Sequence, residues 1–258
     1  MSNINIKSHQ EIAFMRESGR LLASVFAVLD SFIKAGVTTM EINDLVDDYI
    51  VNSLHSRPAS KGQYGYQYTL NSSINEVVCH GVPSIGKKLK ERDIVNIDIT
   101  LEKNGYIADS SKMYMIGNVS PIAKKLVDVT YQAMWQGIKS VKPGNTLGDI
   151  GHAIQTHAEK HGFSVVRDYC GHGIGREMHE EPQVLHIGKP NSGVVLQEGM
   201  TFTIEPMINQ GSFKTKLKKD GWTVITKDKK LSAQWEHTVL VTPTGYEVLT
   251  LRDEEKQS

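Results

Sequence analysis

The chain has 258 residues, 29 basic and 29 acidic side chains, and a hydrophobic content of 39%. This length allows a large buried core, and the zero formal charge gives no overall field that would attract DNA or an anionic membrane. No apolar run approaches the roughly 20 residues that span a bilayer, and the first residues lack the apolar core of a signal peptide. We therefore expect a cytoplasmic protein with no DNA and no membrane among its partners.

Four amphipathic helices are predicted, two in each half of the chain. Ser8 and Thr38 each begin a capping box, and Ser120 precedes a proline at the first helical position. Thr146 and Asp149 cap the fourth helix. The expected ranges are about 8–36, 38–54, 120–141 and 146–162.

A short internal repeat links the two helical pairs. The sequence GVTTMEI from Gly36 matches GNTLGDI from Gly144, and Asp98 corresponds to Glu205 at nearly the same offset. We infer a duplicated unit of two helices followed by strands, related by an approximate two-fold axis. A single domain over residues 1–258 would then contain pseudo-repeats at about 8–117 and 118–251, with a charged, frayed tail at 252–258.

The segment between the second helix and the first long strands is expected to border a pocket. Residues 55–71 are rich in glycine, tyrosine and glutamine, which indicates a loop with a short strand. A strand from Ile74 to Cys79 then delivers His80 into the turn formed by Gly81 and the two residues after it. Cys79 and Cys170 are too few for a disulfide framework, so we expect free, packed thiols.

Two aspartates lie in strand-like sequence, where carboxylates are unusual. Asp98 and Asp109 occur in IVNIDITLEKNGYIADSSKMYM, whose alternation predicts a hairpin. A four-residue loop at 102–105 would place the two carboxylates opposite each other, roughly 5 Å apart, whereas a two-residue turn at 104–105 would not. Facing like charges repel, so the pairing indicates a protonated acid or a bound cation, of which a divalent metal is the natural candidate.

The second half of the chain repeats this arrangement. Glu205 and Glu236 again lie in strand-like runs, with Asp220 and Gly221 between them as a hairpin signal. That two-residue turn would place Glu205 opposite Glu236. Four carboxylates carry a charge that two divalent cations would balance.

Histidines between the two pairs complete a candidate metal site. His172 and His179 lie in the glycine-marked stretch CGHGIGREMHEEP. One imidazole among oxygen ligands suits manganese, iron, cobalt or zinc better than calcium. Two such ions roughly 3.5 to 4 Å apart can share a bridging hydroxide and polarise a carbonyl, which is hydrolysis chemistry. The remaining histidines, apart from His80, are interpreted as structural, including His186 and His237.

Seven lysines surround the second hairpin. We interpret them as a solvated surface, and the alternative is a basic face for an RNA-rich partner. They are Lys214, Lys216, Lys218, Lys219, Lys227, Lys229 and Lys230.

From the first helix to about residue 251, the chain resembles the type I methionine aminopeptidases in their short bacterial form. The specific motifs are NEVVCHGVP with His80, DIVNIDIT with Asp98, DSSKM from Asp109, CGHGIG with His172, MHEEP with His179, TIEPM with Glu205 and EHTVLV with Glu236. The resemblance implies an α+β pita-bread fold, with two pseudo-two-fold related α-α-β-β halves around a curved antiparallel sheet.

The resemblance also implies an activity and a set of roles. The enzyme would remove the N-terminal methionine of nascent chains when the second residue is small, by a hydroxide activated between two metals. His80 would contact the substrate amide region, His179 the scissile carbonyl, and Glu205 would accept a proton from the bridging water. The metals would be cobalt, manganese, iron or zinc, bridged by Asp109 and Glu236 and held by Asp98, Asp109, His172, Glu205 and Glu236.

The same resemblance assigns a substrate pocket. Its walls would be Tyr66, Trp222, Gln63 and Met178, together with His80 and His179. Gln63 stands where a tyrosine is usual and Met178 where a phenylalanine is common, so the rim should be more polar while the base still packs a thioether. We expect methionyl peptides and nascent chains as substrates, a transient ribosome contact and a monomeric state.

Three alternatives remain for the function. The prolidase and aminopeptidase P families share the fold, but their members have an additional amino-terminal domain. A metal-free binding module on the same fold is the non-enzymatic alternative, and metal content would decide it. A protein that primarily binds RNA is the third alternative, although the sequence contains no recognisable RNA-binding module.

Overall fold

The computed structural model describes residues 4–257, which form four long helices packed against short and long strands. The helices are α1 (His9–Phe32), α2 (Thr39–Asp48), α3 (Pro121–Lys139) and α4 (Leu147–Lys160), with a π turn at Tyr49–Ser53 and 3-10 turns at Gln63–Gly65 and Asp253–Gln257. The strands are β1 (Arg57–Pro58), β2 (Leu70–Ile74), β3 (Val77–Cys79), β4 (Ile94–Lys103), β5 (Tyr106–Met115), β6 (Ser164–Val165), β7 (Gly171–Gly173), β8 (Glu180–Val184), β9 (Thr201–Ile204), β10 (Met207–Asn209), β11 (Thr215–Leu217), β12 (Val224–Thr226), β13 (Ser232–Gln234), β14 (His237–Val241) and β15 (Tyr246–Val248).

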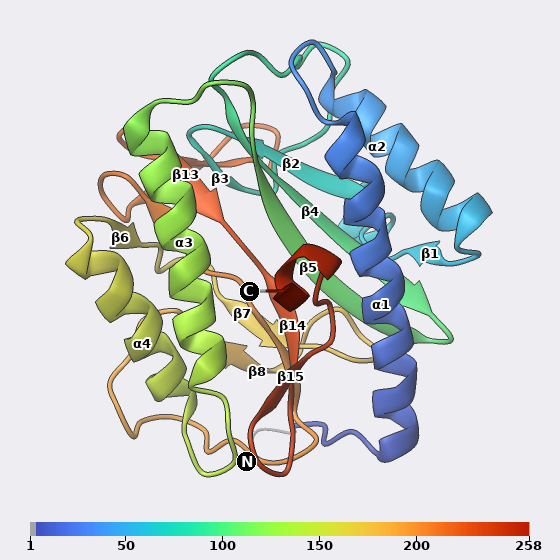
Figure 1. The fold of residues 1–258 in the computed structure, drawn as a ribbon, viewed down its shortest axis with the longest axis vertical. Coiled ribbons are helices and arrows are strands. Elements are labelled where there is room, and N and C mark those ends of the chain that lie inside the picture. Colours follow the sequence, from blue (N-terminus) through green and yellow to red (C-terminus); the bar gives the residue numbers. More distant parts are fainter. Residues whose placement is uncertain (1–3, 258) are drawn as a thin grey trace.

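The four helices form two pairs with the strands between them. In Figure 1, α1 and α2 lie beside β4 on the right, while α3 and α4 lie on the left. Helices α1 and α2 cover an apolar cluster built on β4, whereas α3 and α4 cover a second cluster built on β9 and β14. No helix within residues 4–257 combines the length and apolar character needed to cross a membrane.

The predicted helix starts are confirmed by their caps. Ser8, Thr38 and Thr146 each accept a hydrogen bond from the backbone N–H three residues on, and the acidic side chain of that residue accepts one from the backbone N–H of the cap. Ser120 caps α3 ahead of Pro121. Local capping chemistry therefore determines where all four helices begin.

The internal repeat has the same local structure in both copies. Gly36 and Gly144 both have positive φ, at 94° and 89°, which favours glycine. Gly36 N–H donates to the Leu89 carbonyl at 2.8 Å, and Gly144 N–H donates to the Leu196 carbonyl at 3.1 Å. The segments that lead into α2 and α4 therefore form equivalent backbone hydrogen bonds.

The hairpin of β4 and β5 has a tighter turn than predicted. Lys103 pairs with Tyr106, so only Asn104 and Gly105 form the turn, and both have positive φ. This is the geometry of the two-residue turns that match the twist of paired strands. The predicted four-residue loop at 102–105 is wrong because the Asn-Gly turn preference determines the register.

The tighter turn moves the two aspartates apart along the hairpin. Asp98 pairs with Ser111, and Asp109 pairs with Thr100, so the predicted direct pairing of Asp98 with Asp109 is wrong. The shift is two residues, an even number that leaves every side chain on its predicted face. The two carboxylates are therefore diagonal neighbours on the same side of the sheet.

The second hairpin keeps the predicted register over its whole length. Ile204 pairs with His237 on one side of the acidic residues and Met207 pairs with Gln234 on the other. Both pairs are those expected if Glu205 lies opposite Glu236. The turn is longer than predicted, because Lys218 N–H donates to the Thr223 carbonyl at 2.8 Å and leaves four residues, 219–222, between them.

The predicted strand from Ile74 to Cys79 is interrupted. Asn75 has φ of 54° and exchanges hydrogen bonds with Ile94, accepting at Oδ1 from its N–H at 3.1 Å. β2 before this turn pairs with β4, whereas β3 after it pairs with β12. The turn carries the chain from the first half to the second and delivers His80 between them.

The charged tail is ordered rather than frayed: Arg252 and Glu255 are buried, and Asp253–Gln257 form a 3-10 turn. Arg252 is 1% exposed and contacts the ring faces of Phe26 and Trp235. Its guanidinium donates to the Ser111 carbonyl and to Glu255 Oε1. The final 3-10 turn lies between α1 and α3 in Figure 1, so these residues close the interface of the two halves. Ser258 lies outside the described residues.

Gly81, which follows His80, should tolerate no larger side chain. A Cβ there would lie 2.0 Å from the Ser72 carbonyl oxygen, which belongs to a paired strand and cannot move freely. We expect Gly81→Ala to reduce the free energy of unfolding by about 1–3 kcal/mol, measured by urea denaturation.

Gly86→Ala is the matched control in the same loop. The nearest atom to its Cβ is Ser84 Oγ at 3.6 Å, an ordinary contact. Its stability should stay within about 0.5 kcal/mol of the parent. Equal stability of the two variants would contradict the steric argument.

Candidate metal centre

A cavity of about 560 Å³ lies where the two halves of the chain meet. Asp98 comes from β4, Asp109 from β5 and His172 from β7, while Glu205 follows β9 and Glu236 precedes β14. All five line this cavity. The structure therefore brings together the five side chains that the sequence predicts as ligands.

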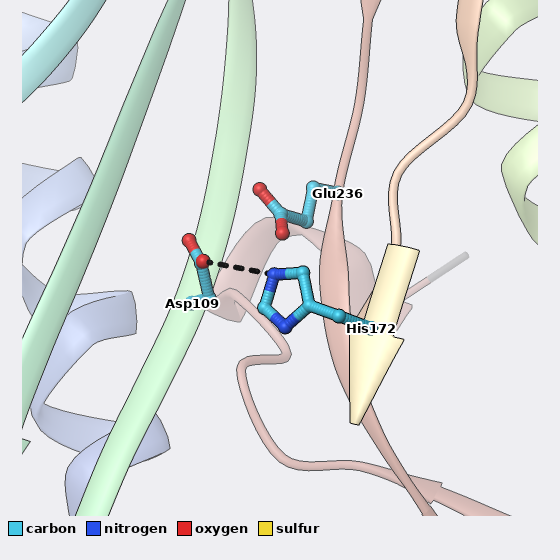
Figure 2. Close-up of side chains that lie close together, drawn as sticks. All are labelled: Asp109, His172 and Glu236. Carbon is cyan, nitrogen blue, oxygen red and sulfur yellow. Dashed lines mark ion pairs between the residues drawn. The ribbon is translucent and has the colours of Figure 1, made fainter. Parts of the chain in front are cut away.

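Three of these side chains form a tight cluster. Ligand atoms of Asp109, His172 and Glu236 all lie within 4.8 Å of one another. Figure 2 shows the three side chains pointing toward a common centre from three separate segments. His172 Nε2 lies 3.8 Å from Asp109 Oδ2 and 3.5 Å from Glu205 Oε1. Asp98 lines the same cavity, and its charge helps to raise the pKa of Asp109.

Burial makes the four carboxyl groups poor anions when no cation is bound. It raises the pKa of Asp98 to about 6 and that of Glu205 to about 8. Burial and the neighbouring acids raise the pKa of Asp109 and Glu236 well above their usual range. Four such groups cannot all ionise without a compensating positive charge.

The donor atoms fit divalent cations. His172 Nδ1 lies 3.0 Å from the Gly173 carbonyl, which can only accept, so the ring carries its hydrogen on Nδ1 and offers Nε2 as a lone pair. Asp109 Oδ1 is buried and has no hydrogen-bond partner within residues 4–257. A bound cation would satisfy both atoms, and carboxylates with one imidazole form a suitable donor set.

Neighbouring polar side chains orient the acids. Asn71 Nδ2 donates to Asp98 at 3.2 Å, and Thr203 Oγ1 donates to Glu205 Oε1 at 2.8 Å. Gln234 Nε2 donates to the other oxygen of Glu205 at 3.2 Å. Glu205 is thus held from both sides before any ligand binds.

Two residues support the centre: His186, which the sequence indicates only as a structural histidine, and Asn96, which it does not single out. His186 is 1% exposed, and its Nε2 accepts a hydrogen bond from the Glu205 backbone N–H at 3.1 Å. Asn96 Nδ2 donates to Ser111 Oγ at 2.9 Å and to the Gln234 carbonyl at 2.7 Å, joining the halves. Nothing in the local sequence marks His186. Asn96 is a polar residue in the otherwise apolar start of β4, and this pattern could have indicated a buried hydrogen-bonding role.

The predicted pocket residues surround the same cavity. Tyr66 is buried, donates its hydroxyl to the Leu70 carbonyl at 2.9 Å and packs its ring 4.9 Å from that of Trp222. Met178 is also buried, while Gln63 is half-buried. The walls are therefore aromatic and thioether surface with one amide at the rim.

Two further histidines, His80 and His179, line the cavity. Burial lowers the pKa of His80 to about 4 and lowers that of His179, so both are neutral near pH 7. The His179 ring packs 4.4 Å from the His172 ring. Both predicted histidines thus line the space next to the acidic cluster.

The sequence from residue 13 to 243 matches the family model of metallopeptidase family M24. The chain belongs to family M24. A methionine aminopeptidase of Salmonella typhimurium is 53% identical over 252 residues, covering 98% of this chain and 96% of that protein. The crystal structure of the methionine aminopeptidase from Rickettsia prowazekii has a TM-score of 0.94 and 49% identity, covering 96% of this chain and all of that one.

These M24 relatives confirm the pita-bread fold predicted from the sequence. A prolidase from Pyrococcus horikoshii has the same fold at a TM-score of 0.77 and 22% identity, but this chain covers only 64% of it. M24 enzymes are metallopeptidases, so use of divalent metal follows from family membership. Within residues 4–257, the acidic cluster offers a donor set that suits such a metal.

The metal-free chain should lose stability as the pH rises from about 6.5 to about 8. Burial raises the pKa of Glu205 from 4.5 to about 8, so in this window the folded chain keeps a proton that the unfolded chain releases. Stability is lost as pH rises toward the folded pKa. Burial lowers the pKa values of His80 and His172 from 6.5, so these histidines make stability rise with pH only below about pH 6.5.

The thermal midpoint in chelator, followed across this pH window, measures the effect. Saturating divalent metal should remove the fall, because the cations replace the protons on the carboxylates. A midpoint that is flat or rises with pH in chelator would contradict the assignment.

Proposed function

We propose that this chain is a methionine aminopeptidase that removes the N-terminal methionine of peptides and nascent proteins when the second residue is small. The observation that carries the proposal is that the acidic cluster lines the same cavity as Tyr66, Met178 and Trp222. A thioether packs well against such surfaces. The 53% identity to a methionine aminopeptidase supports the same assignment.

We propose that Asp98, Asp109, His172, Glu205 and Glu236 hold two divalent ions of cobalt, manganese, iron or zinc, with Asp109 and Glu236 shared between them. Four carboxylates balance the charge of two divalent cations, and the most buried pair suits the bridging position. When bound, the ions would supply Lewis acidity to the peptide carbonyl and acidify water near neutral pH.

The chain's own side chains then divide the proton transfers. Glu205, held by Thr203 and Gln234, takes the proton of the attacking water and delivers it to the leaving amine. His179, kept neutral by burial, donates to the oxygen of the scissile carbonyl as negative charge develops there. His80, also neutral, contacts the amide of the cleaved bond.

The substrate requirement follows from the cavity. A methionine side chain would pack in the cavity against the contacting rings of Tyr66 and Trp222, which fixes the carbonyl beside the acidic cluster. Gln63 at the rim adds an amide that can hydrogen-bond the peptide. We infer that a large second residue would prevent this close approach.

Cleavage of three tripeptides tests the activity. With added cobalt or manganese, Met-Ala-Ser should release free methionine, whereas Met-Lys-Ser and Leu-Ala-Ser should stay intact. Chelator should abolish the reaction. Asp109→Asn should lower kcat/KM at least about 100-fold, because even residues that only support metal ligands cost 10–100-fold.

The control is Asp128→Asn on α3, which removes a carboxylate from a surface pair with Lys124 and should leave turnover unchanged. Cleavage of a Leu-Pro peptide in place of Met-Ala-Ser would favour a prolidase. Absence of both bound metal and cleavage would favour a binding module.

We infer that the lysine-rich hairpin contacts the ribosome, which would place the enzyme in the cytoplasm where nascent chains emerge. Its seven lysines are all exposed, and the same hairpin carries Trp222 of the pocket. A basic surface beside the substrate entrance suits RNA phosphates close to an emerging chain.

The triple variant Lys216→Glu, Lys218→Glu and Lys219→Glu should lose cosedimentation with ribosomes at low salt while keeping tripeptide turnover, because these side chains face solvent. Three exposed lysines on the helical face, changed as Lys139→Glu, Lys142→Glu and Lys160→Glu, form the control. Equal losses in both triples would indicate general charge attraction only.

A further inference from the structure

Tyr64 is an aromatic residue at the cavity mouth that the proposed chemistry does not use. Its side chain is 73% exposed, yet its ring stacks on that of His179 with centroids 5.8 Å apart and planes 16° apart. The Tyr64 hydroxyl lies 3.3 Å from His179 Nδ1. An exposed aromatic side chain is thus fixed on a residue of the proposed active site.

The backbone holds Tyr64 in this place. Its φ of 51° and ψ of 24° lie in the left-handed region, which bulky residues rarely adopt. Flanking glycines, Gly62 and Gly65, also have positive φ, and Gly62 N–H donates to the Tyr66 carbonyl at 2.7 Å. Such a conformation persists only where surrounding structure enforces it, and it commonly marks functional loops.

The two neighbouring histidines have Nδ1 partners of different kinds. His172 Nδ1 faces the Gly173 carbonyl, which can only accept, so His172 keeps its hydrogen on Nδ1. His179 Nδ1 faces a hydroxyl, which can donate. A donated hydrogen bond there leaves the hydrogen of the neutral ring on Nε2. The pair can therefore hold opposite tautomers, one suited to accepting and the other to donating.

We propose that Tyr64 is a positioning residue whose hydroxyl donates to His179 Nδ1 and fixes the tautomer that carries hydrogen on Nε2. This inference rests on the proposed function, in which His179 donates to the oxygen of the scissile carbonyl. Stacking of the two rings also restricts rotation of the imidazole. Gln63 stands where a tyrosine is usual, and Tyr64 is the next residue. The loop therefore still supplies an aromatic hydroxyl next to the site.

Tyr64→Phe removes the hydroxyl and keeps the stacked ring. We expect kcat for Met-Ala-Ser to fall roughly tenfold with KM unchanged, because one hydrogen bond is lost and it acts through His179 rather than on the substrate. Tyr68→Phe is the matched control, since it removes the same atom from a half-buried ring in the same loop. It should leave kcat unchanged.

Nitrogen NMR of histidine-labelled, zinc-loaded protein reads the tautomer without substrate. His179, assigned by the signal missing in His179→Gln, should show an unprotonated Nδ1 and a protonated Nε2 in the parent. In Tyr64→Phe the two shifts should move toward each other as the tautomers mix, whereas His172 should not change.

Several outcomes would overturn the proposal. Unchanged His179 shifts in Tyr64→Phe would show that the hydroxyl does not set the tautomer. A raised KM with unchanged kcat would make Tyr64 a substrate contact instead. If the parent cleaves no methionyl peptide, the proposed function fails, while the nitrogen shifts still decide separately whether Tyr64 sets the tautomer.

Discussion

The repulsion among four buried carboxylates is the constraint on which the rest of this structure depends. Asp98, Asp109, Glu205 and Glu236 each lose hydration, and each raises the cost of ionising the others. The chain tolerates this only because the two halves approach closely enough for a cation to lie among the acids. An arrangement that weakens the isolated protein is therefore the one that prepares it to bind metal.

The interface between the halves is built to hold that arrangement. Asn96 joins β4 to the strand before Glu236, and Ser110 Oγ donates to the Glu236 carbonyl at 2.7 Å. His186 supports the backbone of Glu205 from the other side. Because each support bonds to the backbone of one of the acids or close to it in the chain, the acids are fixed by the fold rather than by one another.

The parts of this structure that could be predicted are those with local causes. Capping residues such as Ser8 determine the helix starts, and carboxylates in strand-like sequence were enough to predict the acidic cluster. The break at Asn75 could not be predicted, because a bond to distant Ile94 stabilises its left-handed backbone. The pairing of Asp98 with Ser111 follows from the turn preference of Asn104 and Gly105. The four-residue loop was expected instead because it would place Asp98 opposite Asp109.

The packed tail has a consequence for the order of biosynthesis. Arg252 bonds to β5 through the Ser111 carbonyl and approaches His237 on β14 at 3.2 Å. It therefore bridges the strand that carries Asp109 and the strand that begins directly after Glu236. These strands cannot acquire their final backing while residue 252 is still within the ribosome. The acidic cluster of the protein is thus completed only after residue 252 has left the ribosome.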